Sequence, residues 1–156
     1  MIVFPANREQ WQALSEFLRH YAGVQPSADL ICMGWVTEEK KLVIVVGFGG
    51  YLGKVAQIHV AYAPGWHFTP RALLGAVFRY AFQTEGREML LGILNSRNEK
   101  AMRLDLHLGF REIFRLHGMH DDGGDLVVLA MTKDECRYLK EQNDAPGVRD
   151  EHSAIH

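Results

Sequence analysis

The 156-residue chain lacks most of the features that mark specialised protein classes. It has two cysteines, Cys32 and Cys136, without CxxC spacing. Two cysteines cannot form a disulfide framework, so we expect free thiols in a reducing cytoplasm. No apolar run approaches the length of a membrane span, and the segment Met1–Pro5 is too short and too soon polar for a signal peptide. The sequence therefore predicts a cytoplasmic protein without a membrane partner.

The chain also lacks an excess of charge of one sign. Its 17 basic and 19 acidic residues give a formal net charge of −2, which offers no basic surface for nucleic acid. Potential metal ligands cluster once, at His117, His120, Asp121 and Asp122. No second cluster supports them, and the glycines among them are typical of a hairpin turn, so we expect no metal site.

The remaining composition is that of an ordinary globular domain. Hydrophobic residues make up 47% of the chain and charged residues 23%. This length suits one domain, which we place at residues 1–142. Residues 143–156 are polar and without periodicity, and they are expected to form a flexible tail.

Hydrophobic periodicity predicts three helices and six strands. The first helix begins at an Asn7 cap and ends near Gly23, the second follows a Thr69 cap with Pro70 in its first turn and ends by Gly86, and the third spans 96–108. The strands are expected at 30–36, 42–48, 55–62, 89–94, 110–116 and 126–132. This order predicts a mixed α/β (α+β) fold with a largely antiparallel sheet flanked by helices.

The most informative segment is Asn98–Phe110. Ser96 can cap a helix here, with Glu99 completing a capping box, and Gly109 can end it in a left-handed conformation. A generic helix–glycine–strand corner would share these features. The spacing Asn-x-x-Ala, followed by a short helix closing in Gly-Phe, also resembles a motif of the GCN5-related N-acetyltransferases, the GNAT superfamily. A histidine at the strand position of His59 is similar to that of phage and prophage members.

The resemblance covers about half of the chain, from Val55 to Thr132. It implies the GNAT fold, acetyl-CoA as co-substrate, and transfer of an acetyl group to an amine of a small molecule or a protein. The acceptor is not identified by any motif. The sequence leaves open whether the protein forms a homodimer.

In the family, the loop after the fourth strand, which corresponds to the expected strand at 55–62, binds the pyrophosphate of the cofactor at a helix N-terminus. The matching residues here are His67, Phe68, Thr69, Pro70, Arg71 and Ala72. Only Ala72 fits the family pattern. Pro70 replaces a glycine and supplies no N–H group, whereas Arg71 adds a cation.

The resemblance also implies roles within the fourth strand. Backbone groups of Val60, Ala61 and Tyr62 would hold the pantetheine arm, and Asn98 would contact the arm or the local backbone. His59, on the strand face opposite its apolar residues, is the candidate general base, with a solvated strand residue as the alternative. Many family members have a thiol-protonating tyrosine where this chain has Asp105. An ionised aspartate is a poor acid, which leaves the role to water, to Tyr62 or to no residue.

Two other functional classes remain open at this stage. The fold could serve as a non-catalytic binding or structural module, related to phage proteins. The chain could also be an unrelated α/β domain, which a splayed gap between the fourth and fifth strands would exclude.

Overall fold

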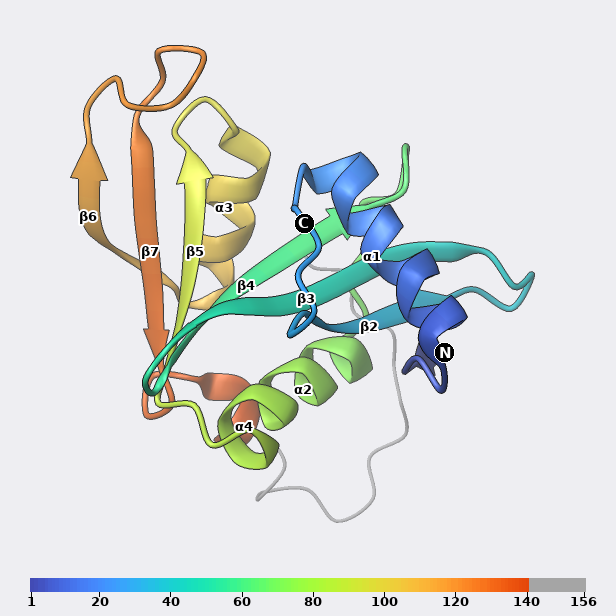
Figure 1. Cartoon of the computed structure of the whole chain (residues 1–156). Helices are drawn as coiled ribbons and strands as arrows, with labels where there is room; N and C mark the ends of the chain where they lie inside the picture. Colours follow the sequence, from blue (N-terminus) through green and yellow to red (C-terminus); the bar gives the residue numbers. More distant parts are fainter. Residues whose placement is uncertain (141–156) are drawn as a thin grey trace.

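The computed structural model describes residues 1–140 of the chain. A seven-stranded sheet lies at its centre, in the order β1-β2-β3-β4-β5-β7-β6 (Figure 1). The strands are β1 (Ile2–Val3), β2 (Ile31–Val36), β3 (Leu42–Leu52), β4 (Val55–Tyr62), β5 (Met89–Asn95), β6 (Arg111–Leu116) and β7 (Leu126–Thr132). Within the described residues, β4 and β5 form the one parallel pair. The prediction of a largely antiparallel sheet is confirmed.

Four helices surround the sheet: α1 (Arg8–Ala22), α2 (Arg71–Arg79), α3 (Glu99–Leu108) and α4 (Arg137–Lys140). A π-helical turn, Tyr80–Thr84, extends α2. α1 covers one face of β2–β4, while α2 and α4 pack on the other face, and α3 lies against β5 (Figure 1). None of the helices in this part of the chain combines the length and apolarity that a membrane span requires.

Local signals located most elements correctly. Asn7 caps α1 by accepting a hydrogen bond from the Gln10 amide at 2.9 Å, and Gly23 ends that helix in a left-handed conformation. Gly109 ends α3 in the same way, with φ of 108°. β1, α4 and the continuation of β3 to Leu52 were not predicted. The expected tail lies outside the described residues.

The two Ser/Thr helix caps predicted from the sequence are wrong. Asn98 caps α3 instead of Ser96, whose hydroxyl accepts a hydrogen bond from the Asp125 amide at 2.8 Å. The N-cap of α2 is Pro70, because the Thr69 hydroxyl bonds to another side chain of the fold. In both cases a group outside the helix takes the hydroxyl that local rules assign to the helix.

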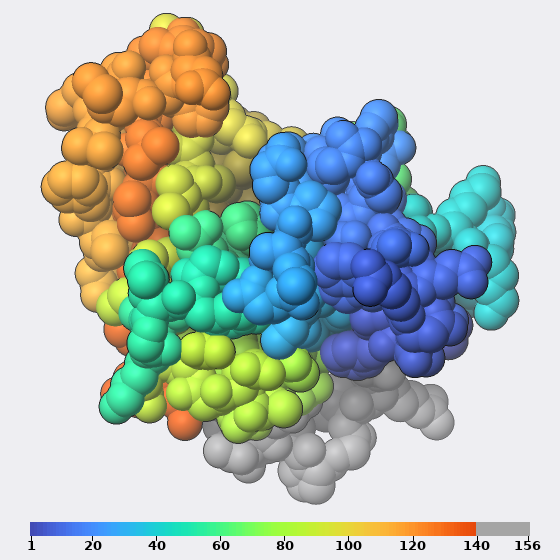
Figure 2. All heavy atoms as spheres, in the orientation of Figure 1, coloured from blue at the N-terminus to red at the C-terminus, as the bar shows by residue number. Residues whose placement is uncertain are grey.

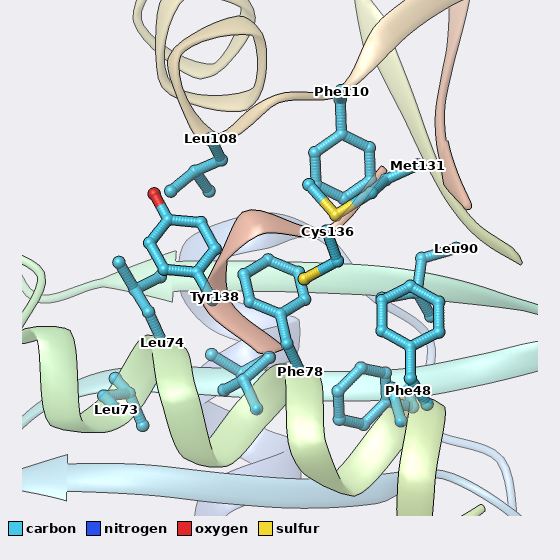
Figure 3. Packing of buried hydrophobic residues seen from close by; sticks show 14 of the residues in the cluster. Phe48, Leu73, Leu74, Phe78, Leu90, Leu108, Phe110, Met131, Cys136 and Tyr138 are labelled. Atoms are coloured by element: carbon cyan, nitrogen blue, oxygen red, sulfur yellow. The ribbon is translucent and has the colours of Figure 1, made fainter. Parts of the chain in front are cut away.

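Buried side chains fill both sides of the sheet. The larger cluster joins α2 and α4 to the sheet and to the end of α3, and Phe78 of α2 stacks on Tyr138 of α4 at 5.2 Å between ring centroids (Figure 3). The smaller cluster, on the opposite face, packs Leu14 and Leu18 of α1 against Val45 and Ala61. These two layers fix β4 from both sides, and β4 carries most of the candidate site.

Candidate active site

β4 and β5 pair over less than half of their lengths. Their parallel register joins 55–57 to 89–91 and then stops. Beyond it, β4 follows β3 as far as Tyr62 and β5 follows β7 as far as Asn95. The strands diverge in Figure 1, and in Figure 2 the yellow-to-orange part of the chain, which holds β5 to β7, projects beyond the blue part that holds α1. We name this separation of the two strand backbones the β4–β5 opening; it lies between Ile58–Tyr62 and Gly92–Asn95.

The opening leaves one edge of β4 without a strand partner. Val60, Ala61 and Tyr62 lie on this stretch, paired with β3 on the other side only. Backbone N–H and C=O groups on such an edge need partners. An extended ligand that carries its own amides can supply them, as in strand addition to a sheet edge.

The two faces of β4 present different chemistry to the opening. Ile58, Val60 and Tyr62 pack toward α2, in the larger hydrophobic cluster. Ala61 packs toward α1, and strand alternation places His59 on that same face. The sequence expectation that His59 lies opposite the apolar residues therefore agrees with the structure, although both faces of the strand are covered by helices.

His59 has a partly buried imidazole. Burial lowers its pKa below the ordinary histidine value, because the charged form loses hydration. No hydrogen bond from residues 1–140 engages the ring. A neutral imidazole in this setting can accept a proton from a bound group near neutral pH.

Tyr62 reaches the α2 side of the opening through its phenol. Its hydroxyl lies 2.8 Å from Thr69 Oγ1, and Thr69 is 5% exposed. Burial raises the pKa of Tyr62, with the Thr69 hydrogen bond acting in the opposite sense. The phenol is therefore a neutral hydrogen-bonding group at physiological pH. A small apolar cavity of about 20 Å³ lies beside it, between α2 and α3.

The N-terminus of α2 lies directly after the loop that follows β4. Pro70 is its N-cap, and no side chain caps the helix. The missing N–H of Pro70 therefore precedes the first helical turn and removes no N–H group from it. Arg71 and Ala72 are exposed in that turn. Uncapped first-turn N–H groups beside an arginine form a favourable setting for an anion.

The same loop touches α3 across the outer end of the opening. Lys100 Nζ lies 3.0 Å from His67 Nδ1 and 5.6 Å from the centre of the Tyr62 ring. Phe68 is held by its carbonyl, which accepts a hydrogen bond from Trp66 Nε1 at 2.6 Å. His67, Arg71 and Lys100 together make this end of the opening basic.

Asp105 projects from α3 toward β5. A Cβ atom on Gly92 would lie 2.9 Å from Asp105 Oδ2, so the carboxyl occupies the space above the first residue of β5 beyond the paired segment. Burial raises the pKa of Asp105 to about 7. The sequence expectation of an ionised aspartate did not include this burial, which favours the protonated carboxyl.

Asn98 and the histidine-rich loop have local structural roles. Asn98 Oδ1 accepts a hydrogen bond from the Ala101 amide at 3.2 Å, which is the contact with the local backbone that the sequence allowed. The 117–125 segment is a hairpin connection, in which Asn95 Nδ2 donates to Asp122 Oδ2 at 2.8 Å. Among residues 1–140, no group of three histidine, cysteine or acidic side chains is arranged to hold a metal ion.

A surface hollow of about 870 Å³ lies outside the opening. It is lined by the hairpin at 37–43 and the loop at 63–66. None of His59, Tyr62 and Asp105 contributes to it. Its walls are mostly loop and hairpin-tip residues, so the opening is the better candidate for chemistry.

Known structures with a similar fold are acetyltransferases. A chimera of spermidine N-acetyltransferase SpeG from Vibrio cholerae with hSSAT is 15% identical, with a TM-score of 0.68 over 89% of this chain and 99% of that one. The fold is shared. The Vibrio cholerae enzyme in complex with CoA and spermine is also 15% identical, with a TM-score of 0.66 over 89% and 97%. A structure described as a candidate phosphinothricin N-acetyltransferase is 17% identical, with a TM-score of 0.64 over 85% and 97%.

These matches settle the architecture. The chain has the GNAT fold, and β4 and β5 separate after their short paired segment. No protein-family model matches the sequence, and no curated protein sequence matches it either.

Sequence reasoning missed Lys100 at the opening and did not foresee the burial of Asp105. Lys100 was not singled out, and its contact with His67 joins segments 33 residues apart, which no local pattern could reveal. Asp105 was noticed only as a departure from the family. One signal was present: Asp105 follows Ala101 by four residues and precedes Leu108 by three, so it falls on the apolar stripe of its helix.

Proposed function

We propose that the protein is an N-acetyltransferase that moves the acetyl group of acetyl-CoA to an amine of a small molecule or a protein. The observation that carries this proposal is the β4–β5 opening, which combines an unpaired β4 edge with an uncapped helix N-terminus at its outer end. Structural neighbours with this fold are named as N-acetyltransferases, and one was solved with CoA and spermine.

The residues around the opening fit the parts of acetyl-CoA. The pantetheine arm contains amides, and the free edge at Val60, Ala61 and Tyr62 can pair with them. The pyrophosphate is an anion, and the first turn of α2, with Arg71 and Ala72, suits it. His67, Phe68, Thr69 and Pro70 shape the loop between these two regions. Asn98 retains its amide nitrogen for the cofactor after its oxygen has capped α3.

Transfer to an amine requires a base on the acceptor side. His59 lies on the α1 face of β4, opposite the face of Tyr62, and its lowered pKa keeps it neutral. The imidazole would accept a proton from the acceptor nitrogen as this nitrogen attacks the thioester carbon. Tyr62 would donate a hydrogen bond from the α2 face. Since both cysteines are buried free thiols, we also infer a reducing cytoplasmic location.

The test has two steps with the wild-type protein. The first measures the melting temperature with and without millimolar acetyl-CoA, which should rise if the native state binds it. The second measures CoA release with a panel of amines: spermidine, spermine, phosphinothricin and an amino-terminal peptide. Binding with turnover supports the proposal. Binding without turnover for any amine favours a non-catalytic module, and no binding overturns the cofactor assignment.

A further inference from the structure

We propose that Asp105 is the general acid that protonates the sulfur of CoA as it leaves, which rests on the acetyl transfer proposed above. The carboxyl of Asp105 is the acidic group that the fold places against β5 at the start of the β4–β5 opening. Neither the cofactor-loop residues nor His59 can perform this step, because they lie at the outer end or on the opposite face of β4.

Geometry locates the carboxyl at the inner end of the opening. β4 and β5 pair as far as Leu91, and Gly92 is the next residue. Asp105 Oδ2 lies so close to Gly92 that a Cβ there would be 2.9 Å away. A cofactor with its pyrophosphate at the start of α2 and its pantetheine arm along β4 would bring its acyl end toward this region.

The reaction needs an acid and a base on different sides of the thioester. His59 faces α1, while Asp105 belongs to α3 and interacts electrostatically with Tyr62 on the other face. The amine nitrogen forms a bond to the thioester carbon and gives its proton to His59. The carbon–sulfur bond then breaks, and sulfur takes the proton of the Asp105 carboxyl. Proton exchange with water returns both residues to their starting states.

Two further properties suit Asp105 to this role. Among residues 1–140, no side chain or backbone group forms a hydrogen bond with its carboxyl, so the proton is not committed elsewhere. Burial raises its pKa to about 7, which makes the protonated form available at neutral pH. Tyr62 is the alternative donor, but burial raises its pKa above that of an ordinary phenol. A phenol of that kind is a weaker acid than a thiol and transfers a proton to a thiolate unfavourably.

The raised pKa of Asp105 has one main cause in its surroundings. In the described part of the chain, desolvation is the cause that shifts its pKa. On β4, the ionisable side chain that interacts electrostatically with Asp105 is Tyr62. On β5, the residue next to the carboxyl is Gly92, which has no side chain. The adjoining cavity is lined by Tyr62, Thr69 and apolar side chains, including those of α2 and α3. The wild-type rate should therefore fall above about pH 7, as Asp105 loses its proton.

The experiment compares the wild type with Asp105→Asn and Asp105→Glu, using acetyl-CoA and the best acceptor from the amine panel. Asp105→Asn should lower kcat by roughly 10²-fold and remove the decline in rate above pH 7, while the affinity for acetyl-CoA stays within about threefold. Asp105→Glu restores a carboxyl and should recover part of kcat together with an alkaline decline.

Each outcome separates the acid role from the proposed function. If the wild type releases no CoA with any amine, acetyl transfer fails and the acid role fails with it. If the wild type is active and Asp105→Asn keeps its kcat and its alkaline decline, the acid role alone is overturned. A loss of kcat in Asp105→Asn with an unchanged alkaline decline shows a structural role and also overturns the proposal.

Discussion

The carboxyl of Asp105 lies where a side chain on Gly92 would be, because a Cβ on Gly92 would lie 2.9 Å from Asp105 Oδ2. Because Gly92 of β5 has no side chain, the carboxyl of Asp105 on α3 can lie at the point where β4 and β5 separate. This pair links the backbone of the opening to the acid that we assign to it.

Gly92→Ala should therefore impair catalysis more than folding. The added methyl group meets the end of a short side chain that can rotate, so we expect a small loss of stability, about 1 kcal/mol. The displaced carboxyl should lower kcat at least tenfold. Gly49→Ala is the matched control, because its Cβ would make an ordinary 3.5 Å contact with Leu30 Cδ1. Equal kcat values in the two variants would contradict the assigned position of the carboxyl.

Asp105→Asn should stabilise the fold at pH 8 but not at pH 3. Burial raises the pKa of Asp105 in the folded protein to about 7, well above that of an unfolded aspartate. As pH rises between these two values, the unfolded chain releases a proton that the native state keeps, so wild-type stability falls and then stays at the lower level above pH 7. Asparagine does not ionise and escapes this loss. Thermal melts should show a Tm several degrees higher at pH 8 only; the same difference at both pH values would contradict the raised pKa.

The Tyr62–Thr69 hydrogen bond should couple the two residues energetically. Tyr62→Phe and Thr69→Val each leave a buried hydroxyl without its 2.8 Å partner and should each lower the free energy of unfolding by about 1 kcal/mol. The double variant leaves no orphaned hydroxyl, so it should cost less than the sum of the single changes. Urea denaturation of all four proteins measures this coupling. Strict additivity would show that the contact contributes no stability.

Removal of positive charge at the outer end of the opening should weaken acetyl-CoA binding. Arg71→Ala should raise the Kd by roughly 10- to 100-fold, since a charge-assisted phosphate contact contributes about 1.5–3 kcal/mol. Lys100→Gln should act in the same direction through the contact with His67. Lys133→Ala, in the exposed turn after β7, removes an equal charge elsewhere and should leave the Kd unchanged. Calorimetric titration at two salt concentrations measures all four proteins. A similar effect of all three substitutions would indicate a general charge effect rather than a phosphate site.

The accuracy of the sequence predictions depended on how local each signal was. The α1 cap at Asn7 and the left-handed Gly109 follow from the chain within a few residues, and both are confirmed. The caps at Ser96 and Thr69 failed because Asp125 and Tyr62, distant in sequence or across the fold, take their hydroxyl groups. A capping propensity depends on neighbouring residues only, so it takes no account of hydrogen-bond partners elsewhere in the fold.

The same distinction separates the features of the candidate site that the sequence could predict from those it could not. The strand and loop residues from His59 to Ala72 could be located because they are continuous in sequence and resemble a known pattern. The altered pKa of Asp105 could not be predicted, because it depends on burial between α3 and β5. For the same reason, Pro70 looked more damaging in the sequence than it is: only the structure shows that it precedes the first helical turn.

The pH dependence of acetyl transfer by the wild type and His59→Gln tests the central claim most directly. The measurement is kcat for CoA release from acetyl-CoA between pH 5 and pH 9, with the best amine acceptor. We expect a bell-shaped profile for the wild type, rising through a group below pH 6.5 and falling above about pH 7. His59→Gln should lower kcat by roughly 10²–10⁴-fold and lose the rising limb. An unchanged kcat with an unchanged rising limb would show that the base lies elsewhere and would contradict an active site with its base and acid on opposite faces of β4.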